Sequence, residues 1–307
     1  MIAQAPLAAG AAAPRLADGA TGGDAPPVDS PGALVDADPS AYRRADELLA
    51  LHIDLVATDA LVNPKALEDP LLTRDLTLDE AVSLERRRHA LLLRGEYRNQ
   101  HGLRGLRLLQ TLVRVVARQR GALIHDPDTL ETVGPAVFEA RRLQASLGNV
   151  ADQVVVVPLP EAAGAGVRLV TRGMRRFGAV DLELGGLAAD PALLQRATFL
   201  LHGLALVLVR LGEVDRSGIA VSAPERIQVE TRDAIAAYAG RPGQLPRCRE
   251  CPEVAAVHLV ERPVEPQDPP GHYVARVVAP RPQSDAAAYN QATWVRGVIE
   301  ALFGPPA

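Results

Sequence analysis

The hydrophobic pattern of this chain changes its period near residue 120, and this change constrains the fold more than any other feature. Over 103–120 apolar residues recur every three or four positions, which predicts a helix. Farther along come three apolar or alternating runs of strand length, at 153–158, 167–171 and 180–184, separated by loops that contain glycine. These runs predict an antiparallel meander. We therefore expect an α+β protein in which N-terminal helices pack on a mainly antiparallel sheet.

Other segments carry weaker signals of the same kinds. Thr77 and Glu80 have the spacing of a capping box, in which each side chain binds a free backbone N–H of the other residue, so a helix is predicted over 77–94. Helical patterns also predict helices at 40–62, 130–147, 190–212, 232–239 and 285–303. Short apolar runs predict strands at 122–125, 218–222, 254–260 and 272–279.

Residues 1–40 are dominated by alanine, glycine, proline and aspartate and have no apolar periodicity. Such a segment cannot bury enough apolar surface to offset its ordering entropy, so we expect a disordered N-terminal arm. The remaining chain divides into a helical region at 41–120 and an α+β region at 121–307. We expect these two regions to form one compact unit.

The composition limits the chemistry and the location. Lys65 is the only lysine and no glycine-rich loop precedes it, which argues against a Walker-type phosphate loop and against Schiff-base catalysis. Two cysteines in 307 residues fit a reducing compartment, so a cytoplasmic protein is predicted. The apolar stretch 197–209 is shorter than the roughly 20 residues that span a bilayer. It predicts a buried core helix and no membrane.

A candidate anion-binding or partner-binding site lies between the second and third strands of the meander. Arg172, Arg175 and Arg176 crowd this connection. Gly173 and Gly178 lie beside them and permit backbone dihedrals that other residues resist. Guanidinium groups bind carboxylates and phosphates well, so the connection predicts a concave anion site.

Asp181 and Glu183 follow this connection and are the candidate catalytic residues. They are two positions apart, so on a strand their side chains share one face. Two carboxylates on one face predict a metal site or acid–base catalysis. The simpler interpretation, a strand with a solvated face whose carboxylates pair with the neighbouring arginines, is favoured.

The same segment resembles one found in uncharacterised bacterial proteins that carry a domain of unknown function. Those proteins read Thr-x-Gly-Leu, then Phe-Gly, then Glu-Ile-Glu or Glu-Leu-Glu. The matching residues here are Thr171, Gly173, Met174, Phe177, Gly178, Asp181, Leu182, Glu183 and Leu184. The resemblance covers 168–184, with Asp181 in place of the first glutamate. It implies a bacterial α+β protein and assigns no activity and no catalytic residue.

A candidate metal site lies near the C-terminal end. Cys248 and Cys251 form a Cys-x-x-Cys pair, and His258 and His272 follow. Two thiolates and two imidazoles complete a tetrahedral zinc site, so these four residues are the candidate ligands. The histidines are too far apart in sequence for a compact pair. Two free or reversibly oxidised thiols are an equally good interpretation, and beyond a possible structural zinc no cofactor is expected.

Charge is distributed unevenly along the chain. Residues 84–120 contain ten arginines against two acids, whereas residues 18–80 contain fourteen acids against four basic residues. Four arginines of the 103–120 helix lie along one face: Arg104, Arg107, Arg114 and Arg118. Such a stripe predicts binding of an acidic partner, or coverage by the protein's own acidic segments, which is favoured. A net charge of −4 and 3% aromatic residues argue against nucleic acid.

These features favour a non-enzymatic interaction or regulatory module with an unknown protein partner. The Arg168–Glu183 connection and the basic helix would form its recognition surfaces, and the acidic arm would dock on the helix. The alternative is an enzyme that acts on an anionic, phosphorylated substrate through the arginine cluster and the paired carboxylates.

Overall fold

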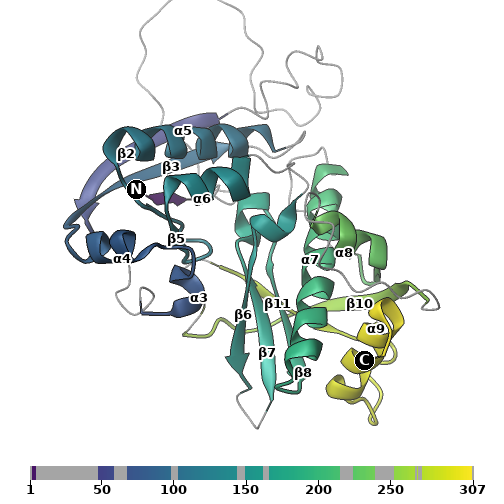
Figure 1. Ribbon diagram of the computed structural model, residues 1–307. Coiled ribbons are helices and arrows are strands. Elements are labelled where there is room, and N and C mark those ends of the chain that lie inside the picture. Colours follow the sequence, from purple (N-terminus) through teal and green to yellow (C-terminus); the bar gives the residue numbers. More distant parts are fainter. Residues whose placement is uncertain are drawn as a thin grey trace, which may run out of the picture.

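A computed structural model of the chain describes residues 2–4, 48–58, 68–97, 103–143, 149–161, 166–214, 224–238, 252–266, 268 and 272–305. These residues form an α+β protein with two sheets of mixed strand direction (Figure 1). The arm predicted to be disordered lies outside the described residues, except for Ile2–Gln4, which form strand β1.

The first sheet has the strand order β2-β3-β1-β4-β5. Its remaining strands are β2 (Leu48–Ala57), β3 (His89–Tyr97), β4 (Ile124–His125) and β5 (Thr132–Val133). β2 and β3 pair antiparallel along their whole lengths, while β1 lies parallel to both β3 and β4. The helix predicted at 40–62 is therefore wrong. Its apolar residues also alternate at strand period, and pairing with β3 decides between the two patterns.

Two helices lie between β2 and β3 in the chain, α3 (Pro70–Thr73) and α4 (Leu78–Glu85), and α5 (Arg104–Arg120) follows β3. The capping box of Thr77 and Glu80 is confirmed, because each side chain bonds the other residue's backbone N–H. α4 ends at Glu85, so the second half of the predicted 77–94 helix is wrong and forms β3 instead. α5 is confirmed and ends at Gly121, which adopts a left-handed conformation with φ 54°.

The second sheet has the strand order β6-β7-β8-β11-β10-β9. Its strands are β6 (Val155–Pro160), β7 (Val167–Arg172), β8 (Asp181–Leu187), β9 (Ile227–Glu230), β10 (Val254–Glu261) and β11 (Val274–Val278). The predicted meander of β6, β7 and β8 is confirmed as antiparallel. β8 and β11 pair in parallel, so the sheet is mixed. The strand predicted at 218–222 lies outside the described residues, and β9 was not predicted.

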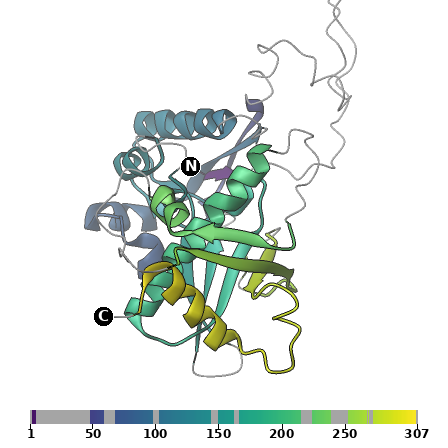
Figure 2. The ribbon, with the colours of Figure 1, turned by 90° about the vertical axis from the view of Figure 1, so that its right-hand side faces the viewer.

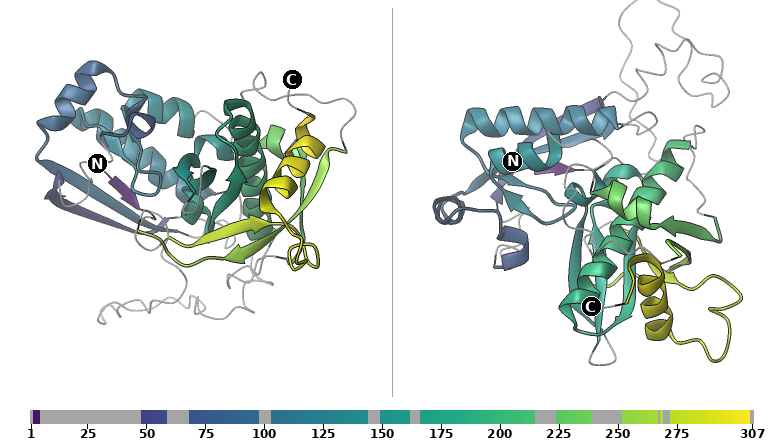
Figure 3. Two further views of the ribbon diagram at one scale, coloured as in Figure 1. Left: turned by 90° about the horizontal axis from the view of Figure 1, so that it is seen from below. Right: turned by 45° about the vertical axis from the view of Figure 1, so that its right-hand side comes forward.

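Helices α7 (Pro191–Val214), α8 (Thr231–Ala237) and α9 (Gln291–Phe303) belong to this second half. α7 contacts β7, β8 and β9, and α9 contacts β8 and β10 (Figures 2 and 3). The helix predicted at 130–147 is replaced by β5, the short α6 (Pro135–Phe138) and a π-helical turn at Glu139–Leu143. Within the described ranges, Pro191–Leu211 is the one stretch long and apolar enough to cross a membrane, but 61% of its apolar window is buried inside the protein.

Both sheets share one hydrophobic core. Its fully buried members include Leu93 of β3, Leu109 of α5, Leu182 of β8 and Leu200 of α7. His202 also lies in this core: its Nε2 donates to the carbonyl of Val154 at 3.1 Å, and its Nδ1 lies 2.6 Å from the hydroxyl of Tyr238. The packing of α5 and α7 into one core brings the β4–β5 turn against the second sheet.

Candidate functional site

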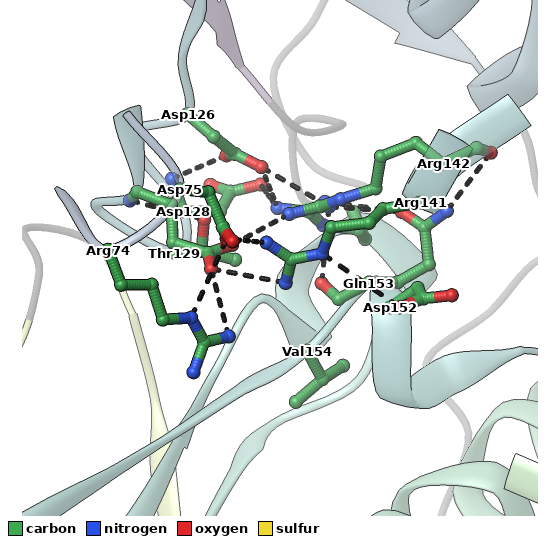
Figure 4. Close-up of polar contacts among 12 residues, drawn as sticks. Arg74, Asp75, Asp126, Asp128, Thr129, Arg141, Arg142, Asp152, Gln153 and Val154 are labelled. Atoms are coloured by element: carbon green, nitrogen blue, oxygen red, sulfur yellow. Dashed lines mark hydrogen bonds and ion pairs between the residues drawn. The ribbon is translucent and has the colours of Figure 1, made fainter. Parts of the chain in front are cut away.

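Three acidic residues of the β4–β5 turn, Asp126, Asp128 and Glu131, lie in a buried cluster of charges (Figure 4). Within the turn, a carboxylate oxygen of Asp126 accepts the backbone N–H of Asp128 at 3.0 Å. Leu130 adopts a left-handed conformation with φ 62°. A bulky residue in that region is strained and persists only where the surroundings hold it.

Arginines from two other elements neutralise the negative charge of these acidic side chains. Arg176, between β7 and β8, donates to Asp126 at 2.7 Å. Arg142, from the π-helical turn, donates to Glu131 at 3.1 Å and lies 3.4 Å from Asp126. Arg141 donates to Asp75 at 2.6 Å, and Figure 4 shows its guanidinium group lying among these acids. These ion pairs therefore connect helical segments to both sheets.

The electrostatics follow from this pairing. Burial alone would raise the pKa of Asp126. The charges of Arg176 and Arg142, with hydrogen bonds from Arg176 and the backbone N–H of Asp128, lower it to about 2. Burial lowers the pKa of Arg142 to about 10, with Arg176 as a second cause, which leaves Arg142 charged at neutral pH. At neutral pH Asp126 is therefore ionised and lies against charged Arg142 and Arg176.

His272 connects this cluster to the second sheet. Its Nδ1 lies 3.0 Å from Asp181, the first residue of β8, and its Nε2 lies 3.5 Å from Asp128. Burial lowers the pKa of His272, but the two carboxylates outweigh that effect and raise the pKa to about 9. The second oxygen of Asp181 accepts from the hydroxyl of Thr171 at 3.0 Å and from the N–H of Met174 at 3.1 Å. Both oxygens of Asp181 are thus occupied inside the protein.

Glu183 is the centre of a second cluster of charges. One oxygen lies 2.9 Å from Arg168 and 2.8 Å from Arg262, and the other accepts from Arg276 at 2.9 Å. Arg168 also donates to Glu265, and Arg262 to Asp268 at 2.8 Å from each of two nitrogens. Both oxygens of Glu183 are therefore neutralised by guanidinium groups.

Asp181 and Glu183 share a face, but the favoured interpretation of a solvated face is wrong. They are only 2% and 1% exposed, because their own partners pack over this face of β8: Thr171 and His272 on Asp181, and three arginines on Glu183. The neighbouring Arg172 and Arg176 are buried too, and Arg175 is partly exposed. The partners of Glu183 come from β7, the end of β10 and β11. The order of strands in the sheet brings these arginines together, and no local spacing in the sequence indicates it.

The arginine stripe of α5 is largely occupied by the protein's own groups. Arg107 donates to the carbonyl of Leu143 at 2.7 Å. Arg114 and Arg118 both donate to Glu139, one to each oxygen. The covering segment is thus the π-helical turn. The side chain of Arg104 lies outside the described residues.

The candidate zinc ligands are only partly described. Cys248 and Cys251 lie outside the described residues. His258 pairs with Val278 at one end of β11, whereas His272 precedes Val274 at the other end. Four strand residues at about 3.3 Å each separate these ends by more than about 13 Å, so one ion cannot bind both histidines. No group of three metal-binding side chains occurs in the part of the chain that the structure describes. A zinc site that uses the cysteines stays a prediction.

A pocket of about 350 Å³, which the sequence did not indicate, opens near the end of α5. Its apolar walls are Leu55, Leu84, Ala90, Leu91, Ala122 and Leu123. Its polar lining comes from Thr58, Arg87, His89, Arg120, His125 and Thr132. Four lining residues are exposed, Leu55, Arg87, His89 and Arg120, and we take these exposed residues as the mouth. The pocket therefore combines apolar walls with a basic mouth.

Comparison of the chain with protein-family models, curated proteins and solved structures finds no match. The resemblance of residues 168–184 to bacterial domains of unknown function stays an expectation.

Proposed function

We propose that this protein is a non-catalytic interaction module that binds an acidic segment of a partner protein. The observation that carries the proposal is the contrast between buried and exposed charge. The candidate catalytic carboxylates Asp181 and Glu183 are buried, and all four of their oxygens have partners within the protein. A general base or a metal ligand needs an oxygen that a substrate or an ion can reach. The two clusters fit a structural role better.

The exposed charge around the pocket mouth supports binding. We call Arg86, Arg87, Arg88 and Arg120 the basic surface. All four are exposed, and Arg87 donates to the carbonyl of Gly121 at 2.8 Å, which fixes the α4–β3 connection beside the end of α5. No carboxylate among the described residues pairs with any of the four. Unpaired arginines on an exposed surface attract acidic segments and accelerate their association.

Exposed apolar side chains beside the basic surface suggest what such a segment contains. Leu55 is 70% exposed and Ile53 is 57% exposed on strand β2, and Leu55 also lines the pocket. Interfaces commonly place an apolar contact inside a charged rim. An acidic partner segment that also carries leucine or another apolar residue therefore fits this surface best.

The test is a binding measurement with a fluorescent peptide of alternating glutamate and leucine residues. Arg86→Glu combined with Arg88→Glu should weaken binding by on the order of tenfold, because two exposed attractions become repulsions. Arg296→Glu, an exposed reversal on α9, is the matched control and should leave affinity unchanged. Equal affinity for all three proteins, or no binding by the wild type, would reject the proposal.

The alternative, an enzyme acting on a phosphorylated substrate, requires Glu183 to give up at least one of its arginines. Turnover of a phosphoester that is lost in Glu183→Gln, with folding retained, would support that alternative. Turnover that is unchanged in this variant would exclude Glu183 as its catalytic residue.

A further inference from the structure

A buried histidine lines the pocket beside α5, and one of its ring nitrogens has no hydrogen-bond partner among the described residues. His125 is 5% exposed and lines the pocket, and its Nδ1 lies 2.9 Å from the hydroxyl of Thr132. No described residue bonds its Nε2. Burial lowers the pKa of His125 to about 4, so the ring is neutral at pH 7. Buried polar groups are normally bonded, and a ring nitrogen without a described partner on a residue that lines a pocket suggests a ligand.

Thr58 provides a second polar group of the same kind. Its backbone N–H donates to the carbonyl of Arg88 at 3.0 Å, which fixes it at the end of the β2–β3 hairpin. Its hydroxyl oxygen is buried, lacks a hydrogen-bond partner among the described residues, and belongs to a residue that lines the pocket. Two residues that line the pocket thus each have a polar side-chain atom without a hydrogen-bond partner in the described part of the chain.

The charge of the pocket mouth differs from that of its interior. His125 and Thr132 are nearly inaccessible, at 5% and 1% exposed, whereas the guanidinium groups of Arg87 and Arg120 belong to exposed residues. A ligand that satisfies both ends has an anionic group at the mouth and a hydrogen-bonding group at the base. Its middle part must be apolar, because leucine and alanine side chains form the walls.

We propose that this pocket binds a small carboxylic acid with an apolar body and a hydroxyl or carbonyl group at its far end. The carboxylate lies at Arg87 and Arg120, and the far polar group bonds Nε2 of His125. A volume of about 350 Å³ is at the small end of ligand pockets, which are typically about 300–1,000 Å³. This inference goes beyond the binding of a partner protein and does not depend on it.

The test uses the full chain labelled with ¹⁵N at histidine. Hydroxyphenylpropionate and hydroxydecanoate represent the aromatic and the linear members of the class, and each is titrated into the protein. At least one should bind and shift the ring resonances of His125. Phenylpropionate, which lacks the hydroxyl, should bind roughly two- to tenfold more weakly than its hydroxylated form, as one neutral hydrogen bond predicts. Tyramine replaces the carboxylate with an amine and should bind more weakly than both.

Two exposed positions provide variants that should not disturb folding. Arg120→Gln should weaken binding of the acids by roughly two- to fivefold through loss of one exposed charge. Leu55→Glu places a carboxylate in the pocket wall and should weaken binding of the acids further. The matched control is Leu78→Glu, since Leu78 is 80% exposed on α4 and does not line the pocket. It should bind as the wild type does.

Three results would overturn the inference. The first is no binding of either hydroxylated acid. The second is binding that leaves the His125 resonances unmoved. The third is binding that Leu55→Glu and Arg120→Gln do not weaken. Arg86→Glu with Arg88→Glu, which tests the partner surface, replaces residues that do not line the pocket, so the two proposals can fail separately.

Discussion

The Nδ1 atom of His272 lies 3.0 Å from a carboxylate oxygen of Asp181 in the interior of the protein. The other ring nitrogen faces Asp128, so one imidazole joins the β4–β5 turn to the first residue of β8. The three residues are far apart in the sequence, and the contact exists only when both sheets are in place. The raised pKa of His272 therefore depends on the folded arrangement of the two carboxylates.

Stability should fall as the pH rises from 6.5 to 9. The pKa of His272 is about 9 in the folded protein and near 6.5 when unfolded, so the folded state binds the extra proton over this range. Protonated His272 stabilises the folded state fully below pH 6.5, and this stabilisation is lost as the pH passes 9. The total change in unfolding free energy is about 3 kcal/mol. Urea denaturation at pH 6.5 and pH 9.5 measures it. His272→Gln should be less stable at pH 6.5 and should lack this part of the pH dependence; an unchanged slope would contradict the assignment.

Stability should also fall on the acidic side, for the opposite reason. Burial lowers the pKa of both His125 and His202 from 6.5 to about 4. The unfolded chain therefore binds more protons between pH 4 and 6.5, and the stabilisation is complete above pH 6.5 and lost toward pH 4. Denaturation of His202→Gln should show a shallower loss than the wild type over this range. Parallel curves would show that His202 does not titrate as its burial implies.

The arginines around Glu183 should differ widely in their contribution to stability. Glu183→Gln leaves buried Arg168 and Arg262 without their shared charge and should cost about 3–5 kcal/mol of unfolding free energy. Arg276→Ala removes a partner whose side chain is 49% exposed and should cost less than about 1 kcal/mol. Chemical denaturation of the two variants measures the difference. Similar losses would mean that the cluster is more hydrated than its burial indicates.

Replacing two helical glycines with alanine should change the stability of the protein in opposite directions. A Cβ on Gly203 of α7 would lie 2.9 Å from the backbone nitrogen of Ala234, so Gly203→Ala should force α7 and α8 apart at a cost of about 1–3 kcal/mol. Gly297 of α9 has no atom within 4 Å of the same position. Gly297→Ala should therefore stabilise the protein by up to about 1 kcal/mol, since alanine is the better helix former. Thermal denaturation of both variants tests the contrast.

The acidic N-terminal arm should compete with an acidic peptide for the basic surface. Deletion of residues 1–40 is a poor test because it also removes strand β1. Replacing the five aspartates at 18, 24, 29, 36 and 38 with asparagine leaves β1 intact. Binding of the glutamate–leucine peptide should then become stronger, most clearly at low salt where screening is weak. Unchanged affinity would show that the arm does not cover this surface.

The sequence predicted local elements well where one signal dominated. The α5 helix has an apolar stripe and a glycine at its end, and the α4 start has a capping box, so both were predictable. β2 was mispredicted because its apolar residues fit both periods. The sequence also placed Asp181 and Glu183 on one face, but it could not show that three arginines from distant segments would surround Glu183. Periodicity carries no information about which strands become neighbours.

The sequence by itself determined the α+β class, the antiparallel meander and the long core helix α7. These follow from short-range spacing and composition, which act within a few residues. Only the tertiary structure decided that the carboxylates of β8 are buried and neutralised and that a basic-mouthed pocket opens beside His125. Burial and ion pairing depend on segments brought together from across the chain, and the free energy that orders them is a property of the whole core.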